Sequence, residues 1–215
     1  CLVGSEMCIR DRDTLRAEAL GFLGVAESAT HHEMAELYAK ALPAYIEKGA
    51  EFELVDAKLK EFDLEKLGKA IDHERDQQFT YLGLQTLYDR YFIHKDGIRF
   101  ELPQIFFMRV AMGLAIEEKD REARAIEFYN LLSTLDYMSS THTLFNAGAL
   151  RPQLSSCYLT TVPDDLSGIY GAIHDNAMLS KFAGGLGNDW TPVRALGSYI
   201  KGTNGKSQGV VPFLK

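Results

Sequence analysis

The sequence has 215 residues, of which 46% are hydrophobic and 25% are charged, and its formal net charge is −7. This length and composition predict one or two packed, soluble domains and exclude the disordered classes of protein. The negative charge argues against broad nucleic-acid binding, which needs clustered cations along the phosphate backbone. No run approaches the roughly 18 apolar residues typical of a membrane span. We therefore expect a cytoplasmic protein with neither a nucleic-acid nor a membrane partner.

Residues 1–12 are expected to be foreign to the protein. They read as the in-frame translation of a transposase-type sequencing adapter, and we exclude them from fold reasoning as an adapter-derived artefact. A short signal peptide is the alternative, but charged residues interrupt an apolar run that is too short. Because Cys1 and Cys8 belong to this head, Cys157 is the expected native thiol. A single cysteine cannot build a disulfide framework.

The first third of the chain is predicted to be helical. Residues 14–26 and 33–48 carry apolar side chains at helical spacing. Thr30 is a candidate N-cap and Gly49 a candidate stop for the second of these helices. Pro43 should kink or shorten that helix, because proline lacks the N–H group that an interior position needs.

Four further helices are predicted from residue 63 onward. Asp63 can cap a short helix, and residues 77–91 carry apolar side chains around most of a helical circumference, so that helix should be largely buried. Residues 95–97 have turn chemistry. Pro103 suits the first position of the next helix, and residues 120–135 form another.

The chain changes character after this helical region. Residues 139–154 are rich in turn residues, residues 155–162 read as a strand, and residues 167–182 read as a helix that the glycines of 184–187 end. The pattern predicts an α-rich α/β fold, with a helical region over 13–138 followed by a strand and a helix.

The most specific part of the sequence is the stretch 141–159, which reads T-H-T-L-F-N-A-G-A-L-R-P-Q-L-S-S-C-Y-L. It places Cys157 in an extended run just after an Asn-Ala-Gly turn. Six other motifs accompany it in a fixed order along the chain: D-Q-Q-F-T-Y-L-G-L-Q-T-L-Y-D-R-Y-F, E-L-P-Q-I-F-F-M-R-V-A-M-G-L-A, A-I-E-F-Y-N-L-L-S, D-D-L-S-G-I-Y, S-K-F-A-G-G-L-G and R-A-L-G-S-Y-I-K-G-T-N-G.

Together these motifs resemble the large, catalytic subunit of class I ribonucleotide reductase. The match is diffuse between residues 13 and 71, and no functional residue is taken from there. The resemblance implies that residues 139–215 open a ten-stranded α/β barrel that carries substrate and effector segments. It also implies that the chain is a fragment truncated at residue 215, without the radical cysteine, the second redox cysteine or the ATP-binding regulatory cone. This fragment alone should be inactive.

A lone cysteine is more often a small buried hydrophobic residue than a reagent. The resemblance assigns Cys157 a different role, as one half of a redox dithiol that reduces the ribose 2′-carbon. Its partner cysteine would lie beyond Lys215, within the short distance that disulfide geometry demands.

The resemblance also supplies candidate substrate residues. Thr141 and Ser156 match positions that bind the substrate's diphosphate and ribose region, and Gly185 matches a glycine that brings backbone close to the substrate. The structural alternatives are a helix-ending cap for Thr141, a strand hydroxyl for Ser156 and a helix C-cap at the glycines. His142 departs from the family pattern, which has proline there, and this loosens the loop beside Thr141.

The candidate effector residues lie on either side of the predicted helix 167–182. Asp164, Asp165 and Leu166 match a segment that binds the deoxynucleoside triphosphate effector, although an acidic helix N-cap would explain the two aspartates equally well. Further residues match the phosphate-contacting neighbourhood on a mobile loop over 191–209, where isolated surface charges are the alternative. These residues are Lys181, Arg194, Lys201 and Gly202.

Other patterns predict no separate site. The glycines at 184–187 follow a helix rather than a strand, which is the wrong context for a dinucleotide-binding fingerprint. The His-His-Glu at 31–33 lacks the second histidine of a zinc helix. We find no set of metal ligands and expect no metal site in this chain.

The resulting hypothesis is a fragment of ribonucleoside-diphosphate reductase, which makes DNA precursors by thiyl-radical chemistry. The resemblance implies a ribonucleoside diphosphate substrate and ATP or deoxynucleoside triphosphate effectors with Mg²⁺. It also implies a small radical-generating subunit with its own metallocofactor, thioredoxin or glutaredoxin as reductant, and a homodimer. Two alternatives stay open: a class II or III reductase with the same barrel, and a non-catalytic nucleotide-binding or helical interaction module.

Overall fold

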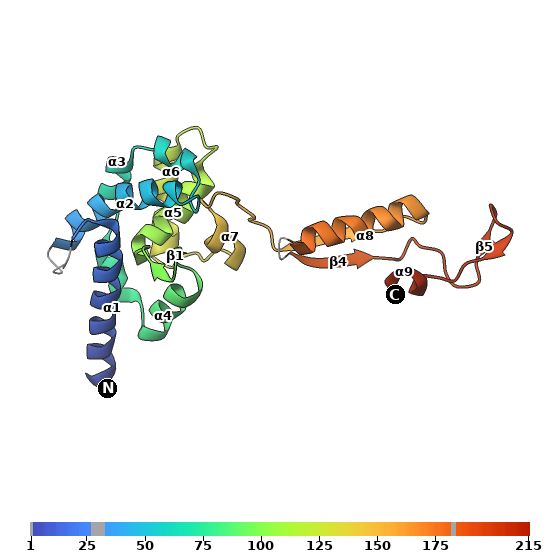
Figure 1. The fold of residues 1–215 in the computed structure, drawn as a ribbon, viewed down its shortest axis with the longest axis horizontal. Helices are drawn as coiled ribbons and strands as arrows, with labels where there is room; N and C mark the ends of the chain where they lie inside the picture. The colour runs from blue at the N-terminus through green and yellow to red at the C-terminus, as the bar shows by residue number, and fades with distance from the viewer. Residues whose placement is uncertain (1, 27–32, 182–183) are drawn as a thin grey trace. The chain divides into compact units, whose positions relative to one another are not determined.

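The computed structural model describes residues 2–26, 33–181 and 184–215, with the backbone alone for residues 2–12 (Figure 1). The chain divides into two compact units, unit 1 (Cys1–Leu154) and unit 2 (Ser155–Lys215), each of which is described by itself. None of the helices in these described ranges is long and apolar enough to cross a membrane.

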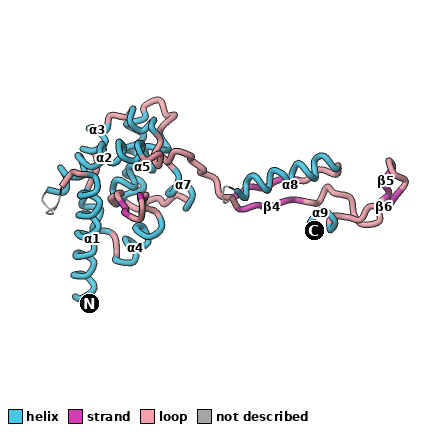
Figure 2. Tube along the Cα trace, viewed as in Figure 1, coloured by secondary structure: helices cyan, strands magenta, loops and turns pink. Residues whose placement is uncertain are grey.

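Unit 1 is built almost entirely of helices, which Figure 2 shows in cyan. Its one strand pair is the short antiparallel hairpin of β1 and β2 among the described residues. In chain order its elements are α1 (Leu2–Leu23), α2 (Met34–Glu51), the 3-10 helix η2 (Ala57–Glu61), α3 (Leu64–Lys69), the 3-10 helix η3 (His73–Gln78), α4 (Tyr81–Arg90), β1 (His94–Lys95), β2 (Ile98–Arg99), α5 (Pro103–Ala115), α6 (Arg121–Ser133) and α7 (Thr141–Asn146).

Helix α5 forms the centre of unit 1. Pro103 occupies its first turn as predicted, and apolar residues run through nearly every position of the helix. Most of its side chains are therefore buried, among them Phe106, Phe107 and Val110 at 0% exposure. Helices α2 and α6 pack on it, so the core of unit 1 is one continuous apolar cluster.

Local signals predicted most of these helices, but the expected stop of α2 at Gly49 was wrong. Pro43 lies inside α2 without ending it, and Gly49 is a buried residue within the helix rather than its stop. A Cβ on Gly49 would lie 2.6 Å from a methyl carbon of Val55, so the glycine serves close packing instead. The predicted N-cap at Thr30 lies outside the described residues.

The region 77–91 also differs from the expected single buried helix. It divides into η3 and α4, and the Thr80 side chain caps α4 by accepting a hydrogen bond from the Gly83 N–H. Within α4 only Leu84 is buried, and Leu82 is 73% exposed. The apolar residues around its circumference therefore do not all face this unit's core.

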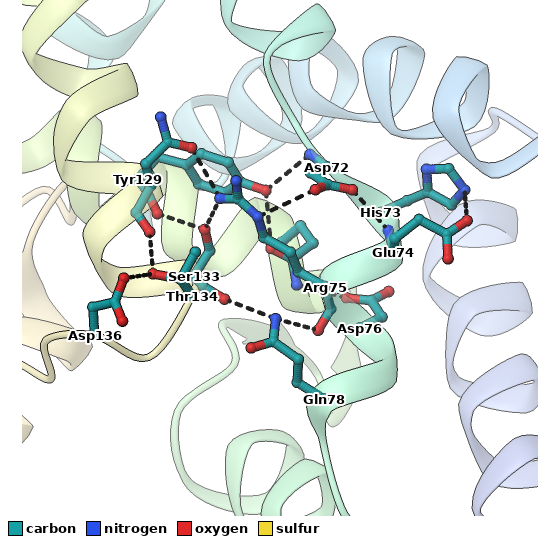
Figure 3. Close-up of polar contacts among 12 residues, drawn as sticks. Asp72, His73, Glu74, Arg75, Asp76, Gln78, Tyr129, Ser133, Thr134 and Asp136 are labelled. Atoms are coloured by element: carbon teal, nitrogen blue, oxygen red, sulfur yellow. Dashed lines mark hydrogen bonds and ion pairs between the residues drawn. The ribbon is translucent and has the colours of Figure 1, made fainter.

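A polar network joins η3 to α6 inside unit 1 (Figure 3). The Tyr129 hydroxyl accepts a hydrogen bond from the Asp72 N–H at 3.0 Å. Arg75 donates to the Ser133 hydroxyl at 2.5 Å, and Gln78 donates to the Ser133 carbonyl oxygen at 3.2 Å. These bonds satisfy polar groups at the edge of the core and fix the two helices together.

Unit 2 has a strand–helix–strand arrangement, with β3 (Cys157–Thr161), α8 (Leu166–Lys181) and β4 (Gly185–Asp189). Strands β3 and β4 pair in parallel, with Cys157 opposite Gly185. After them come the antiparallel hairpin of β5 (Tyr199–Ile200) and β6 (Gly205–Lys206), and the short α9 (Val211–Leu214). A small apolar cluster around Val162, Ile169 and Val193 holds this unit together.

The predicted fold class, a helical region followed by the first strand and helix of an α/β barrel, is confirmed. Strand β3 and helix α8 were predicted within a few residues of their ends, whereas strand β4 was missed. The two compact units divide between Leu154 and Ser155, and α7, which lies before this division, packs against α5.

Candidate functional site

The thiol of Cys157 stands at the first position of strand β3 and is exposed. The parallel pairing with β4 sets Gly185 beside it, and the Gly185 N–H donates to the Ser156 carbonyl oxygen at 2.7 Å. The Ser156 hydroxyl oxygen lies 3.6 Å from the Cys157 sulfur. Three residues singled out in the sequence, at 156, 157 and 185, thus meet at one end of a parallel strand pair.

Gly184, just before β4, and Gly185, its first residue, permit this close pairing. A Cβ on Gly185 would lie 3.2 Å from the Ser156 carbonyl oxygen, and one on Gly184 would lie 2.6 Å from the Tyr158 ring. Side chains here would crowd the start of β3. The glycines were expected to end the preceding helix, and the Gly184 N–H does donate to the Leu179 carbonyl oxygen in the last turn of α8 at 3.2 Å. From Gly185 onward the chain forms a strand, because pairing with β3 supplies partners for its backbone groups.

Thr141 belongs to unit 1, where it is the exposed first residue of α7. The structural alternative, a helix-ending cap, is therefore wrong for Thr141, since the residue begins a helix. Its hydroxyl oxygen lies 3.4 Å from the Tyr91 hydroxyl oxygen, and the Tyr91 ring stacks on Phe145 with centroids 4.7 Å apart. The Thr141 hydroxyl thus stands at a fixed place on the surface of unit 1.

A second group of predicted residues borders a hollow of about 270 Å³ in unit 2. The hollow lies between the start of α8 and the segments that follow β4. The lining includes Asp164, Asp165, Leu166 and Arg194, all four of which were predicted from the sequence, together with Ile169, Val193, Ile200, Thr203, Ser207 and Phe213. Its wall therefore combines a mostly apolar surface with one cation and two carboxylates.

Asp164 and Arg194 bind each other at the edge of this hollow. The Arg194 Nε donates to Asp164 Oδ2 at 2.8 Å and to Oδ1 at 3.1 Å, and the Arg194 backbone N–H donates to Oδ1 at 3.0 Å. Chiefly the backbone hydrogen bond holds the pKa of Asp164 below its usual range. Within the described part of the chain, the two Nη groups of Arg194 have no hydrogen-bond partner, so they can still grip an anion.

Asp165 has a clear structural role, as its sequence position suggested. Its Oδ1 accepts from the Gly168 N–H at 2.8 Å, which satisfies one free donor in the first turn of α8. Leu166 is 64% exposed on the same turn, where it faces the hollow.

The three other predicted effector residues do not line the hollow. Lys181 is exposed at the last position of α8. Lys201 and Gly202 lie in the turn between β5 and β6, directly between two residues of the lining, Ile200 and Thr203. The expected loop over 191–209 thus contains a short hairpin whose turn adjoins the hollow.

Sequence reasoning missed several residues that shape these sites. Ser207 and Phe213 line the hollow although neither carries a recognisable motif. In unit 1, Arg109 is fully buried in the apolar helix α5, and its charge among apolar neighbours was the signal that could have marked it. Among the described residues no three His, Cys, Asp or Glu side chains gather as metal ligands would.

Comparison with protein families places this geometry in a known context. Residues 77–152 match the family described as "Ribonucleotide reductase, all-alpha domain", and residues 155–215 match "Ribonucleotide reductase, barrel domain". The chain belongs to the ribonucleotide reductase large-subunit family. The change from one family segment to the next coincides with the division between unit 1 and unit 2.

Curated relatives agree with this family. The chain is 58% identical over 183 residues, 85% of its length, to "Ribonucleoside-diphosphate reductase subunit alpha" of Chlamydia muridarum. It is 43% identical over 197 residues, 91% of its length, to the subunit alpha of Helicobacter pylori strain 26695. It is 47% identical over 152 residues, 70% of its length, to "Ribonucleoside-diphosphate reductase large chain" of Schizosaccharomyces pombe.

The chain spans about a fifth of the length of these ribonucleotide reductase relatives: 18% of the Chlamydia muridarum protein, 23% of the Helicobacter pylori protein and 18% of the yeast protein. The segment that matches the all-alpha domain comes first in the chain, and the segment that matches the barrel domain follows it directly.

Proposed function

We propose that this chain is the part of a ribonucleoside-diphosphate reductase large subunit that carries the first redox cysteine, part of the substrate site and much of the effector site. The observation that supports this most directly is the exposed Cys157 thiol at the start of β3, paired with Gly185 in a segment that matches the barrel domain. A buried Cys157 sulfur, with no surface exposed to a substrate, would have argued against this proposal.

The proposed reaction exchanges the ribose 2′-hydroxyl for hydrogen. A thiyl radical takes the 3′-hydrogen, and the 2′-hydroxyl leaves as water. Cys157 and a second cysteine outside this sequence supply two electrons and two protons, one proton going to the water and one to C2′, and the two sulfurs close to a disulfide. The 3′-hydrogen then returns to C3′. Thioredoxin or glutaredoxin reduces the disulfide for the next turnover.

The chain's own contribution to substrate binding is local and polar. Ser156 presents its hydroxyl beside the thiol, and Gly185 leaves backbone exposed where a Cβ would crowd the strand pair. We propose that these two groups contact the ribose side of the substrate and that the Thr141 hydroxyl contacts its diphosphate.

We propose the hollow in unit 2 as the site of a deoxynucleoside triphosphate or ATP effector, bound with Mg²⁺. Its apolar wall, with Leu166 and Ile200, suits a base, while the Nη groups of Arg194 suit a phosphate. The carboxylates of Asp164 and Asp165 can accept from a ribose hydroxyl. Lys181, Lys201 and Gly202 extend the proposed phosphate contacts.

The remaining partners are proposed with the function. They are a small radical-generating subunit that holds the metallocofactor and a second copy of the large subunit. The cytoplasm is the proposed location, and residues 139–215 are the proposed start of the catalytic barrel segment. Residues 1–12 are proposed to be adapter-derived.

Turnover by the full-length subunit tests the redox role. With the small subunit and a dithiol reductant present, Cys157→Ser should abolish reduction of cytidine diphosphate, because serine cannot form the disulfide. It should still bind deoxynucleoside triphosphate, because the hollow lies at the far ends of the strands. The matched control is Thr161→Ser on the same strand, which should keep its turnover. A normal rate in Cys157→Ser would leave only a nucleotide-binding role.

A further inference from the structure

A buried ion pair in unit 1 includes none of the residues that the proposed chemistry uses. Arg109 and Glu101 both have side chains that are 0% exposed, and the Arg109 Nε donates to Glu101 Oε1 at 2.7 Å. The Tyr45 hydroxyl donates to the same oxygen at 2.7 Å, and the Ile93 N–H donates to Oε2 at 2.9 Å. These partners fix the orientation of the guanidinium group.

The other side of the guanidinium group faces the end of α7. Arg109 Nη1 donates to the Ala147 carbonyl oxygen at 2.6 Å and to that of Phe145 at 3.3 Å, and Nη2 donates to that of Leu144 at 3.2 Å. The last carbonyl groups of a helix have no partners within the helix. A single arginine therefore supplies donors to three carbonyl oxygens at the end of α7.

Stability alone does not explain this arrangement. A fully buried ion pair adds little net stability, and an apolar pair of similar volume is often as good or better. An apolar pair could not, however, hold three carbonyl oxygens in place. The arrangement therefore fits a role in fixing where α7 lies.

Two other contacts point to the same role. Glycine is needed at both 113 and 148, because a Cβ on Gly113 would lie 2.1 Å from the Gly148 nitrogen. The chain after α7 thus presses directly on α5. At the other end of α7, the Tyr91 hydroxyl lies 3.4 Å from the Thr141 hydroxyl. Helix α7 is held at both ends, and its exposed residues are Thr141, which carries a hydroxyl, and the apolar Phe145.

We propose that Arg109 is a positioning residue, which fixes α7 and through it the Thr141 hydroxyl that meets the substrate's diphosphate. The inference rests on the proposed function, because it requires Thr141 to contact substrate. Arg109 itself is buried and touches no reacting atom. Its loss should weaken substrate binding through misplacement of Thr141 and leave the effector hollow in unit 2 unchanged.

The test compares Arg109→Lys with Arg16→Lys in the full-length enzyme. Both arginines form buried ion pairs in unit 1, since Arg16 binds Asp76 at 2.5 Å, but among the described residues Arg16 makes its ion pairs with Asp13 and Asp76 and none with α7. Lysine keeps the charge and loses the forked donors. Arg109→Lys should raise KM for the diphosphate substrate about three- to tenfold, the range expected for one lost hydrogen bond. Arg16→Lys should leave KM unchanged.

A milder pair of variants covers the case in which lysine prevents folding. Tyr45 and Tyr38 both lie on α2, are fully buried and donate to a carboxylate at 2.7 Å, Tyr45 to Glu101 and Tyr38 to Asp76. Tyr45→Phe should raise KM in the same direction as Arg109→Lys, whereas Tyr38→Phe should not. A purely structural role would lower the active fraction, and hence apparent kcat, equally in both variants without a change in KM.

Thr141→Val separates the two proposals. If Thr141→Val raises KM while the Arg109 and Tyr45 variants match their controls, the positioning role is overturned and the substrate role of Thr141 stands. If Thr141→Val leaves KM unchanged, both fall. A rise in KM for Thr141→Val and for the α7-linked variants, with unchanged effector binding, supports the inference.

Discussion

The contact between Gly113 and Gly148 gives a prediction whose magnitude follows from the structure. A methyl group added by Gly113→Ala would lie 2.1 Å from the Gly148 nitrogen and 2.5 Å from the Ala147 carbonyl carbon. Both atoms belong to the backbone, so a change of side-chain rotamer cannot relieve the clash. Gly148 has φ of +77°, and a Cβ there would lie 2.9 Å from the Arg109 carbonyl oxygen. The turn therefore has little freedom to move away.

Two effects of opposite sign decide the outcome. Alanine in a helix interior is better than glycine by roughly 0.5–1 kcal/mol. Overpacking a tight site costs about 1–3 kcal/mol, and a backbone clash belongs at the upper end of that range. We therefore expect Gly113→Ala to lower the free energy of unfolding by about 2 kcal/mol, the clash less the gain in helix preference. For a domain of this size the midpoint temperature should fall by roughly 3–8 °C.

The matched control is Gly21→Ala in helix α1, where an added Cβ would meet nothing within 4 Å. This variant gains the helix preference without a clash, so its midpoint should stay the same or rise slightly. Thermal unfolding followed by circular dichroism at 222 nm measures both variants. A Gly113→Ala protein as stable as Gly21→Ala would refute the close packing of α7 on α5.

Two further predictions concern titratable groups. Burial raises the pKa of Tyr129 to about 12 from its ordinary value of 10. The unfolded chain therefore loses this proton at a lower pH than the folded chain, and the free energy of unfolding should fall as pH rises from 10 to 12. In urea unfolding, the free energy of unfolding of Tyr129→Phe should fall by about 3 kcal/mol less than that of the parent over this pH range. Equal decreases in the two proteins would contradict the burial of Tyr129. Arg194→Ala should raise the pKa of Asp164 only part of the way to its usual value, because the backbone N–H of residue 194 remains as a donor. Carboxyl NMR titration measures this shift, and an unchanged pKa would show that the guanidinium plays no part.

The sequence by itself determined the features that depend on neighbouring residues. Pro103 marked the start of α5, and Asp63 marked the start of α3, where its side chain accepts from the Lys66 N–H. The extended run at Cys157 and the helix after it were equally readable. The order of the motifs was sufficient to indicate the family, because motifs are read from residue identities alone and do not depend on how the chain packs.

Helix α4 and strand β4 show what local patterns could not decide. Apolar residues around α4 predicted burial, yet Leu82 is exposed, because a pattern does not say how many neighbours a helix has within this chain. The glycines of β4 have low intrinsic preference for any regular structure. They become a strand through pairing with β3, a contact between segments 28 residues apart, as in Cys157↔Gly185.

The tertiary structure alone decided which charged groups meet. Asp164 and Arg194 were both singled out in the sequence, but only the fold showed that they bind each other across 30 residues. In the sequence, Arg109 is a lone cation in an apolar helix and no pattern gives it a role. The structure shows its partners, which are Glu101 and the carbonyl groups at the end of α7. Electrostatic and hydrogen-bond partners are fixed by distance in space, whereas periodicity and capping report only on residues a few positions apart.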